Sequence, residues 1–541
     1  MHTNPIHDGI GSKAITSSQF RYLFTQRLSA RIQPAMLQFS PKQSLNTNLP
    51  LRSLKSSIRA ISSYFAVCLI LLLGGTCGSA NAQEPPGLFV EGYAWPISAK
   101  AGETVNLHVS TSAGQFQYEI YRIGADSKAV KVATTDKSSI YTAPGKAFPV
   151  PEKASAEGCG WPGSAKVQIP AEWSSGYYEV RFSVQDSGGG YTHRGRRTAQ
   201  STCYFVVRPS NPGANTKILL QLSTNTYNAY NNWGGFSLYA FNGKASNQGH
   251  KVSFLRPPSS QFGSWEHSLV SWAETNGIVL DYAINEDLEY HPELLEQYKL
   301  VLSVGHDEYW SSKMRDNLEA YIAKGGNVAF FSGNSICWQV RPENDGTALT
   351  SWKQNTFSDP QYQTGDFKTL ATLWSHHLIG RPENRLTGVG FLFGGYHLSH
   401  GHFMGGSGGY TIQRPNHWIF EGTQLMQGDL LGARHTVVGY ECDGCEMEIG
   451  PDGLPAPTGN DGTPKNFQIL ATAPAMWHKD DSEWYEKYEK KRLGSAVLGT
   501  YTVPSGGTVV TAGSTDWAHG LRGGDPAIER ITRNILNKLG R

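Results

Sequence analysis

The chain has 541 residues, of which 39% are hydrophobic and 17% charged, so it is neither a small disulfide-stapled peptide nor a largely disordered protein. Its 60 glycines and 28 prolines are typical of a loop-rich protein with many short strands rather than a helical bundle. The formal net charge of +2 comes from the first 82 residues, because without them 39 basic and 44 acidic residues remain, which argues against a nucleic-acid-binding protein.

The N-terminal segment predicts export. Lys55 and Arg59 precede an apolar run at residues 64–73, and small residues follow as far as Ala82. This pattern is typical of a signal peptide. We therefore expect residues 1–82 to be a leader and signal peptide, cleaved near Ala82, and the protein to be periplasmic or secreted. Because the apolar run is too short to cross a bilayer as a helix, we expect no membrane span.

Five of the seven cysteines follow the predicted cleavage site: Cys159, Cys203, Cys337, Cys442 and Cys445. In an oxidising compartment we expect Cys159 to pair with Cys203 and Cys442 with Cys445, which leaves Cys337 buried and free. A redox-active or metal-binding role for the pair Cys442 and Cys445 stays open as an alternative.

Residues 88–208 show the period-two alternation of β-strands. The apolar residues that share strand faces are Val105, Leu107, Val109, Phe116, Tyr118, Ile120, Tyr178, Val180, Phe182 and Val184. We therefore predict an N-terminal immunoglobulin-like β-sandwich domain, which with its linker covers residues 83–213.

After the linker, strand and helix patterns alternate. We predict strands at 218–222, 252–255, 278–282, 300–304 and 328–331. We predict helices near 268–275 and at 526–539, and a further helix in which Met314 and Leu318 belong to one apolar stripe. Alternation of this kind is typical of a mostly parallel sheet with helices on its faces. Residues 214–541 are thus predicted to be an α/β domain of the amidotransferase or flavodoxin-like type with Gly- and Trp-rich elaborations, and its ligand is expected at the carboxyl ends of the strands.

Three ionisable residues, His306, Asp307 and Glu308, stand where an apolar strand ends. If the strand stays extended, His306 and Glu308 point to one side and Asp307 to the other. The alternative is that Asp307 caps the next helix and Glu308 stabilises its positive end.

Two further polar segments follow strands of the same predicted sheet. Residues 224–235 are rich in amides, phenols and glycines without periodicity, which predicts a loop that is either a pocket rim or a surface loop. The run FFSGN at 330–334 places the amide of Asn334 at the same edge of the sheet.

Several runs, in this order along the chain, resemble the large (beta) subunit family of N,N-dimethylformamidase over roughly residues 88–541. They are AYNNWGGFSLY at 229–239, LSVGHDEYWS at 302–311, FFSGN at 330–334, PNHWIFEGT at 415–423, VVGYE at 437–441 and GSTDWAHGL at 513–521. The resemblance implies a hydrolase that cleaves the C–N bond of a small amide at a mononuclear Fe³⁺ held by two tyrosinates and one glutamate.

Carried onto this chain, the resemblance makes Glu308 the carboxylate ligand and Tyr230 one tyrosine ligand, with Tyr227 an open alternative. The second tyrosine matches Tyr178, which on its strand phase is equally a core tyrosine. The surrounding polar residues of the family match His306, Asn334, Lys353 and Glu441. We expect His306 to take a proton from the attacking water and Asn334 or Lys353 to stabilise the oxyanion. A homo-oligomer or a small partner subunit is left open.

Four alternatives compete with this interpretation. His397, His400 and His402 have a spacing that suits zinc. Ser407 formally matches a nucleophile elbow but lacks a preceding strand and a following helix, and Cys337 lacks the small neighbours that a nucleophilic thiol needs at such a turn. As a different class of function, the abundant aromatic residues suit a non-catalytic exported glycan-binding or interaction protein on the same fold.

Overall fold

A computed structural model describes residues 87–133, 135–186, 197–398, 405–477 and 493–541, and residues 84–541 form one compact unit. The predicted leader and signal peptide therefore lie outside the described residues. Within those residues, no helix is both long enough and apolar enough to cross a bilayer.

The N-terminal part of the described chain is built from strands in two sheets. One sheet contains β1 (Val90–Trp95), β3 (Thr104–Thr111) and β7 (Ala165–Gln168). The other contains β2 (Ser98–Ala99), β9 (Arg197–Val207), β8 (Gly176–Asp186), β4 (Gln115–Ile123) and β5 (Ser127–Val130), with β6 (Ile140–Pro144) also pairing with β4. A single apolar core joins the two sheets and includes every residue of the predicted alternation. The immunoglobulin-like classification stays a prediction.

The larger of these sheets also contacts the rest of the protein. Tyr177, Tyr204 and Val206 are buried in the same core as residues of the following α/β region, and the Tyr177 hydroxyl donates a hydrogen bond of 2.9 Å to Ser260 Oγ. Because neighbouring residues of a strand point to opposite faces, Tyr177 and Tyr178 belong to different cores.

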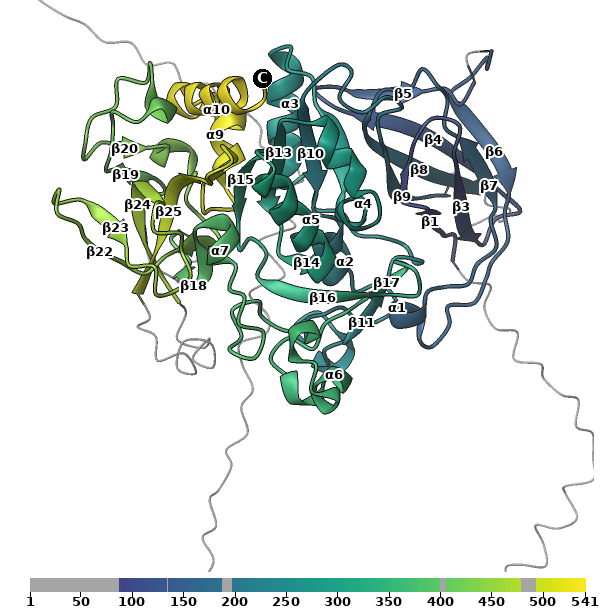
Figure 1. The fold of residues 1–541 in the computed structure, drawn as a ribbon. Coiled ribbons are helices and arrows are strands. Elements are labelled where there is room, and N and C mark those ends of the chain that lie inside the picture. The colour runs from purple at the N-terminus through teal and green to yellow at the C-terminus, as the bar shows by residue number, and fades with distance from the viewer. Residues whose placement is uncertain (1–86, 134, 187–196, 399–404, 478–492) are drawn as a thin grey trace, which may run out of the picture. The chain divides into compact units, whose positions relative to one another are not determined.

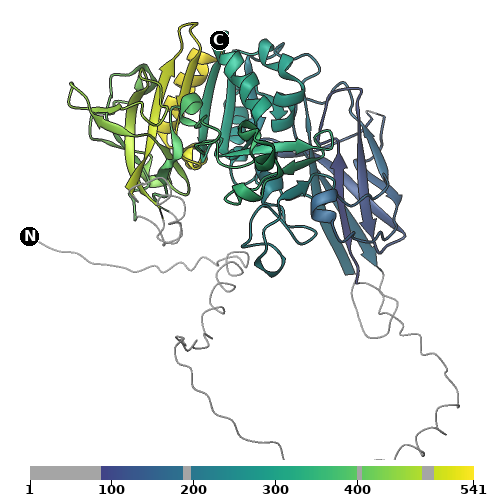
Figure 2. The ribbon, with the colours of Figure 1, turned by 60° about the horizontal axis from the view of Figure 1, so that its bottom comes forward.

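The α/β region is organised by one nine-stranded sheet (Figures 1 and 2). Its order is β12 (Asp281–Ile284), β10 (Ile218–Leu222), β13 (Leu300–His306), β15 (Asn327–Gly333), β26 (Thr508–Thr511), β25 (Leu493–Thr502), β24 (Gln468–Met476), β19 (Tyr410–Ile412) and β20 (Leu430–Leu431). The first five strands are parallel, and the remaining pairings are antiparallel. The sheet is therefore mixed. From β26 to β20 in the sheet order, each strand is antiparallel to its neighbour, so no helical crossover is needed between them.

Helices cover both faces of the parallel strands (Figure 1). One apolar core unites alternate strand residues such as Val301 with α4 (Asn285–Tyr290), η2 (Pro292–Gln297) and α5 (Ser312–Ala323). The other unites the intervening residues such as Leu302 with α3 (Glu266–Thr275), α9 (Trp517–Gly523) and α10 (Pro526–Leu539). The strand and helix predictions for this part of the chain are thus largely confirmed.

The remaining elements are short. The predicted strand at 252–255 forms β11 (Lys251–Ser253), which joins a separate sheet with β17 (Ala348–Thr350), β16 (Trp338–Glu343) and β14 (Tyr309–Ser311). Two separate antiparallel pairs are β18 (Gly390–Gly395) with β21 (Cys442–Gly444) and β22 (Met447–Ile449) with β23 (Pro455–Pro457). Short helices are α1 (Ala154–Glu157), α2 (Thr224–Tyr230), η1 (Lys244–Ser246), η3 (Thr356–Ser358), α6 (Pro360–Thr364), η4 (Phe367–Thr369), α7 (Asn384–Thr387), η5 (Trp418–Phe420) and η6 (Ala433–His435).

The predicted disulfides are wrong for the described cysteines, all five of which are free. Cys159 packs in a small cluster with Trp161, whereas Cys203 lies in the sandwich core. Cys442 and Cys445 belong to the two different cores of the α/β region, so their side chains are buried among different residues. Cys337 is buried and free, as predicted.

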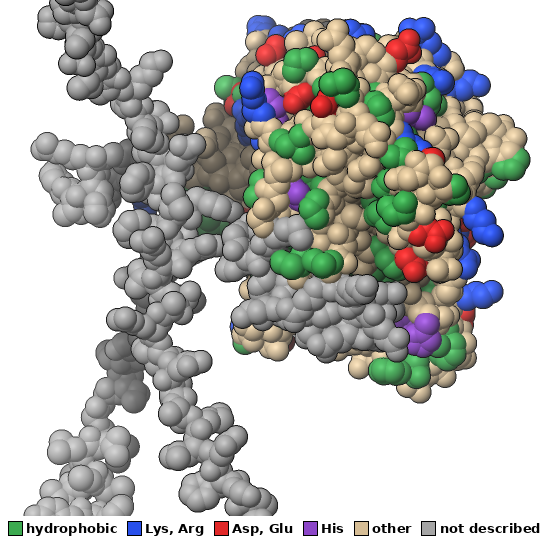
Figure 3. All heavy atoms as spheres, turned by 90° about the vertical axis from the view of Figure 1, so that its left-hand side faces the viewer, with side chains coloured by type: hydrophobic (Ala, Val, Ile, Leu, Met, Phe, Trp, Pro, Cys, Tyr) green, Lys and Arg blue, Asp and Glu red, His purple; other side chains and the backbone are tan. Residues whose placement is uncertain are grey.

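The surface in Figure 3 shows one face of the molecule, the one on the left in Figure 1. On the described part of that face, basic and acidic side chains alternate with hydrophobic ones. Large hydrophobic side chains exposed in the C-terminal part of the chain include Met426, Ile449 and Leu493. Mixed charge of this kind is ordinary for a protein surface.

Candidate active site

The end of strand β13 places the first site residues. Gly305 has a φ of +79°, and a Cβ there would lie 2.2 Å from Cβ of Trp265, so only glycine fits. Beyond it, Nε2 of His306 lies 3.2 Å from Oε2 of Glu308. Asp307 points the other way and accepts hydrogen bonds from Ser303 Oγ at 2.8 Å and Asn285 Nδ2 at 3.3 Å. The prediction that His306 and Glu308 point to one side of the strand and Asp307 to the other is confirmed.

The alternative role of Asp307 as a helix cap is wrong. Helix α5 begins after Ser311, whose Oγ accepts a hydrogen bond of 3.1 Å from the backbone N–H of Met314. Asp307 is instead fully buried, and burial raises the pKa of its carboxyl.

The first part of the predicted loop at 224–235 is instead a helix, α2, which ends at Tyr230, whereas residues 231–235 are not helical. Its residues are almost all buried, so no amphipathic stripe marks it in the sequence. The buried Arg256 guanidinium donates to the carbonyl oxygens of Asn231 at 2.8 Å, Trp233 at 2.6 Å and Phe236 at 3.0 Å, which lie just after the helix. These bonds satisfy carbonyl groups of the chain reversal that follows the helix.

Two tyrosine hydroxyls converge on the Glu308 carboxylate. Tyr230, the last residue of α2, donates to Oε2 at 3.2 Å, and Tyr239 donates to Oε2 at 2.8 Å and to Oε1 at 2.9 Å. The chain between them folds back, because the N–H of Leu238 bonds to the carbonyl of Ala229 at 2.9 Å. The two phenol rings lie 4.2 Å apart between centroids.

The other two tyrosines of the sequence hypothesis lie elsewhere. Tyr227 donates its hydroxyl to Glu266 instead of Glu308. Tyr178 is buried in the sandwich core, stacked on Trp173 at 4.8 Å, and donates to the carbonyl of Ser174 at 2.7 Å. The predicted placement of Tyr178 beside Glu308 is wrong, because its strand phase turns it into that core.

Tyr239 is the site residue that sequence reasoning missed. It ends the run AYNNWGGFSLY, in which Tyr230 is the other candidate, so the motif itself held both tyrosines. The glycine pair Gly234 and Gly235, with φ values of +81° and +105°, marks the reversal that brings the two ends together. A chain reversal at these two glycines could have been predicted from the sequence, and it would have placed Tyr239 beside Tyr230.

The remaining predicted residues surround Glu308 and Glu441. His306 Nε2 lies 2.8 Å from Glu441 Oε2, and the Asn334 amide donates to the same oxygen at 3.2 Å. Lys353 Nζ lies 3.4 Å from the centre of the Tyr239 ring and donates to the Tyr309 hydroxyl at 3.0 Å. The structure therefore brings together all four polar residues that the resemblance implied.

Further hydrogen bonds hold Glu308 in place. Trp338 Nε1 donates to Oε1 at 2.7 Å, and the backbone N–H of Glu308 donates to Thr226 Oγ1 at 2.9 Å. The Tyr309 hydroxyl donates to that of Tyr239 at 2.7 Å, which extends the network to Lys353. A carboxylate with this many donors is fixed in orientation.

Burial and charge set the protonation of these groups. Burial raises the pKa values of the Tyr230 and Tyr239 hydroxyls well above their usual range, and the Glu308 carboxylate adds to this. Burial alone would lower the pKa of His306, but the Glu441 and Glu308 carboxylates outweigh it and raise it to about 10. Burial lowers the pKa of Lys353 to about 8 despite the nearby Glu308.

Opposing effects act on Glu308. Burial raises its pKa, but hydrogen bonding and charge from His306, together with the Lys353 ammonium and the Tyr239 hydroxyl, outweigh burial and lower it. The carboxylate form of Glu308 is therefore favoured.

The site opens into a cavity of about 310 Å³. Its walls include Glu308, Glu441, Asn334, Lys353, Tyr230 and Tyr239, together with a group of apolar and aromatic side chains. Among the described residues, His306 is not part of the lining, because it lies behind Glu308 and Glu441. A small molecule in the cavity would thus contact the carboxylates directly.

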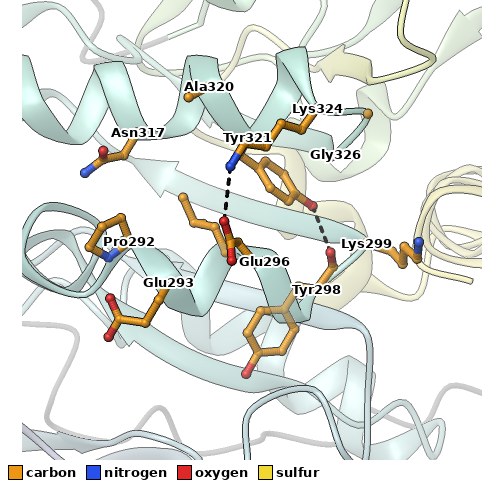
Figure 4. A pocket seen from close by; sticks show the side chains of 12 residues that line it. Pro292, Glu293, Glu296, Tyr298, Lys299, Asn317, Ala320, Tyr321, Lys324 and Gly326 are labelled. Atoms are coloured by element: carbon orange, nitrogen blue, oxygen red, sulfur yellow. Dashed lines mark hydrogen bonds and ion pairs between the residues drawn. The ribbon is translucent and has the colours of Figure 1, made fainter.

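A larger groove of about 630 Å³ lies between η2 and α5 (Figure 4). The ion pair between Lys324 and Glu296, 3.1 Å long, spans it. Its lining contains none of the predicted site residues, so we assign the chemistry to the cavity beside Glu308.

Backbone strain also marks the site. Asn334 and Lys353 both have a φ of 49°, in the left-handed region that residues other than glycine seldom adopt. Such conformations persist where the surrounding structure imposes them, and they cluster at functional sites.

The competing zinc site receives no support from the geometry. Both ring nitrogens of His397 are engaged, Nδ1 with the carbonyl of Pro474 at 2.6 Å and Nε2 with the N–H of Gly408 at 2.9 Å. His400 and His402 lie outside the described residues. In the described part of the chain, no group of three or more His, Cys, Asp or Glu side chains is arranged to hold a metal ion.

The cluster of Tyr230, Tyr239 and Glu308 nevertheless suits a metal ion through tyrosine oxygens. The two phenol oxygens lie within hydrogen-bond distance of the Glu308 carboxylate, and both phenol protons point at it. If both phenols are deprotonated, a cation can take the place of these protons. Three hard oxygen donors with these charges fit a trivalent iron. The residues present therefore fit the group that the resemblance implies, with Tyr239 in place of Tyr178.

Comparison with known proteins agrees with the sequence resemblance. A family model described as "N,N-dimethylformamidase beta subunit-like, C-terminal" matches residues 117–531. The chain belongs to this family. The beta subunits of N,N-dimethylformamidase from Alcaligenes sp and Paracoccus aminophilus are each 23% identical over 460 residues. Each match covers 70% of this chain and 54% of the relative, so the chain spans about half the length of these relatives.

Among solved structures, a family 123 glycoside hydrolase from Clostridium perfringens aligns over 47% of this chain and 46% of its own. The identity is 9% and the TM-score is 0.11, so this alignment carries no argument about fold or function.

Proposed function

We propose that this protein is an exported, metal-dependent hydrolase that cleaves the C–N bond of an amide. The observation that carries the proposal is the convergence of the Tyr230 and Tyr239 hydroxyls on the Glu308 carboxylate, at the wall of a cavity that Glu441, Asn334 and Lys353 also line. Membership of the N,N-dimethylformamidase beta subunit-like family supports an amide as substrate.

In this proposal, Tyr230, Tyr239 and Glu308 hold one Fe³⁺. A bound trivalent ion keeps the two phenols deprotonated and acts as a Lewis acid toward a carbonyl. Bulk water has restricted access to the three oxygens, because Glu308 is only 3% exposed and the two phenols are partly buried in the network described above.

Glu441 is the proposed acceptor of the proton from the attacking water. It lines the cavity, whereas His306 lies 2.8 Å behind it, so His306 acts through Glu441 rather than directly as the sequence suggested. Water adds to the carbonyl carbon, its proton passes to Glu441, and the same proton is returned to the amide nitrogen as the C–N bond breaks. The products are a carboxylic acid and an amine.

Lys353 and Asn334 serve the oxygen that gains negative charge. Both line the cavity with N–H groups. Asn334 already donates to Glu441, so its main contribution is to orient that carboxylate. Lys353 is therefore the better placed donor for the developing oxyanion.

Export and assembly complete the proposal. Cleavage near Ala82 would deliver the described unit to the periplasm or the medium. The relatives are named as beta subunits, which supports a partner subunit for this chain as well.

Metal analysis of protein purified in air tests the proposal. We expect near one iron per chain and a visible absorption band from tyrosinate-to-Fe³⁺ charge transfer. Tyr230→Phe and Tyr239→Phe should each lose the band and most of the iron, whereas Tyr227→Phe, whose hydroxyl bonds to Glu266, should keep both. Protein without iron, or loss of the band in Tyr227→Phe alone, would contradict this site and favour a non-catalytic binding protein.

A further inference from the structure

The cavity beside Glu308 has two chemically different parts. The polar part consists of the carboxylates, phenols, amide and amine already described. The other part is apolar and aromatic, and its members include Leu373, Phe391, Leu392, Tyr396 and Trp477. A site for a very small polar amide would need only the first part.

The aromatic part is a packed cluster of rings. The ring centroids of Phe391 and Trp477 are 4.7 Å apart, those of Phe391 and Tyr396 are 5.8 Å apart, and those of Tyr396 and Trp477 are 6.4 Å apart. The last two pairs meet edge to face, at 85° and 84°. Such arrangements are favourable for aromatic rings, so the cluster holds its shape without a ligand.

The backbone beneath these rings is also fixed. Tyr396 and Met476 exchange two hydrogen bonds, of 3.0 Å and 2.9 Å, which tie the end of β18 to the end of β24. Phe391 and Leu392 lie on β18, and Trp477 directly follows β24. The apolar wall is therefore built on two paired strand ends, and preorganised walls of this kind bind ligands with little ordering cost.

The size of the cavity points in the same direction. Its 310 Å³ equals the volume of about ten liquid waters. A small formamide fills roughly half of that space or less, so it would not cover the aromatic wall. Phe391 and Leu392 are each 7% exposed, so the wall is open enough to be touched and yet largely sheltered from solvent.

We propose that the substrate is an amide bearing an aryl-sized apolar group, which packs on the wall formed by Phe391, Leu392 and Trp477 while the amide lies against Glu308 and Glu441. This inference rests on the proposed amide hydrolysis and extends it to a substrate class. The apolar group belongs to either the acyl or the amine part of the amide, and matched probes separate the two.

Calorimetric binding to the purified, iron-containing protein tests the inference with three amides. N-methylformamide is the reference, N-benzylformamide adds a phenyl group on the nitrogen side, and N-methylbenzamide adds one on the acyl side. Because each buried CH₂ strengthens binding about fourfold, we expect at least one aryl amide to bind about tenfold or more tightly than the reference. If neither aryl amide binds more tightly, the inference is overturned.

Variants locate the apolar group. Leu392→Trp fills the space beside the apolar wall. It should lower the ratio of the affinity for the aryl amide to that for N-methylformamide at least about fivefold. Ile449→Trp, at a side chain that is 72% exposed and outside the cavity, should leave the preference unchanged. Circular dichroism checks folding, and Leu373→Trp replaces Leu392→Trp if the latter does not fold. A preference that survives in the folded cavity variant overturns the assignment to this wall.

Turnover of the same amides separates the inference from the proposed function. Hydrolysis of N-methylformamide without any preference for aryl amides supports the proposed function and overturns the inference. Tight binding of an aryl amide without hydrolysis of any of the three supports the apolar site and contradicts the proposed function.

Discussion

Helix α2 carries two tyrosines three residues apart, and each donates its hydroxyl to a buried glutamate. Tyr227 bonds to Glu266 of α3, and Tyr230 bonds to Glu308 after β13. Both tyrosines have pKa values raised well above the usual range, with burial as the largest cause. Burial and a Tyr–Glu hydrogen bond are therefore shared by both pairs and do not by themselves mark an active site.

The two pairs differ in what surrounds the carboxylate. Burial dominates at Glu266 and raises its pKa to about 7, although the Tyr227 hydroxyl opposes this. At Glu308, His306, Lys353 and a second phenol outweigh burial, and the group also faces the cavity. A buried carboxylate that stays ionised and reaches a cavity is suited to bind a cation, whereas one that is readily protonated is suited to a structural hydrogen bond.

The largest expected effect comes from exchanging carboxylates for amides in the two pairs. Glu308→Gln removes the carboxylate charge of the proposed metal site, so we expect loss of nearly all bound iron and a fall in amide hydrolysis of more than about 100-fold. Glu266→Gln keeps its hydrogen bond to Tyr227 and should retain iron. Elemental analysis and single-turnover kinetics measure both.

The comparison fails if the two variants behave alike. Equal loss of iron from Glu266→Gln and Glu308→Gln, with both proteins folded, would mean that the metal does not distinguish the two tyrosine–glutamate pairs. Retention of iron in Glu308→Gln would remove Glu308 from the ligand set.

An intermediate effect is expected on the pH dependence of stability. Because the pKa of Glu266 is raised to about 7 in the folded protein, the folded state binds a proton that the unfolded state releases at lower pH. The contribution of Glu266 to the free energy of unfolding is fully present below the unfolded-state pKa of about 4.5. It is lost as the pH rises through 7, which lowers the free energy of unfolding by on the order of 3 kcal/mol.

Urea unfolding at pH 5 and pH 8 checks this sign. Wild-type protein should be less stable at pH 8, and Glu266→Gln should narrow the difference between the two pH values. Other buried acids shift in the same direction, because burial raises the pKa values of Glu286 and Glu383 to about 8 as well. A difference that Glu266→Gln leaves unchanged would show that Glu266 does not titrate in this range.

The smallest effect is expected at the third tyrosine of the sequence hypothesis. Tyr178→Phe removes one hydrogen bond to the carbonyl of Ser174 and should lower the free energy of unfolding by about 1 kcal/mol. Iron content and the visible band should not change, since Tyr178 lies in the sandwich core. Loss of the band in a folded Tyr178→Phe protein would restore this residue as a candidate ligand.

Regular periodicity made much of the fold predictable from sequence. The strands β10, β13 and β15 and the helices α5 and α10 follow the predicted ranges closely, because each has a strong apolar pattern. The alternation rule also placed His306 and Glu308 on one side and Asp307 on the other. Local geometry was enough for these features.

Contacts between distant segments were not predictable in the same way. Helix α2 has no exposed polar face, so its pattern resembled a loop. Tyr239 reaches Glu308 only because the chain reverses at Gly234 and Gly235. Tyr178 is also a tyrosine, but it lies on the strand face that points into the sandwich core and away from the site. The antiparallel half of the sheet was likewise not predicted, although its strands β24 and β25 are nine and ten residues long, because their pairing partners lie in segments without a clear periodic pattern.

The left-handed backbone at Asn334 and Lys353 has a consequence for engineering this protein. At a φ of 49°, glycine relieves the backbone strain of either residue, but each substitution also removes a buried side chain and its hydrogen bond, from Asn334 to Glu441 or from Lys353 to Tyr309. Such variants would relieve backbone strain and yet lack the amide and the amine of the cavity. Directed evolution of this chain should therefore screen turnover and thermal tolerance together.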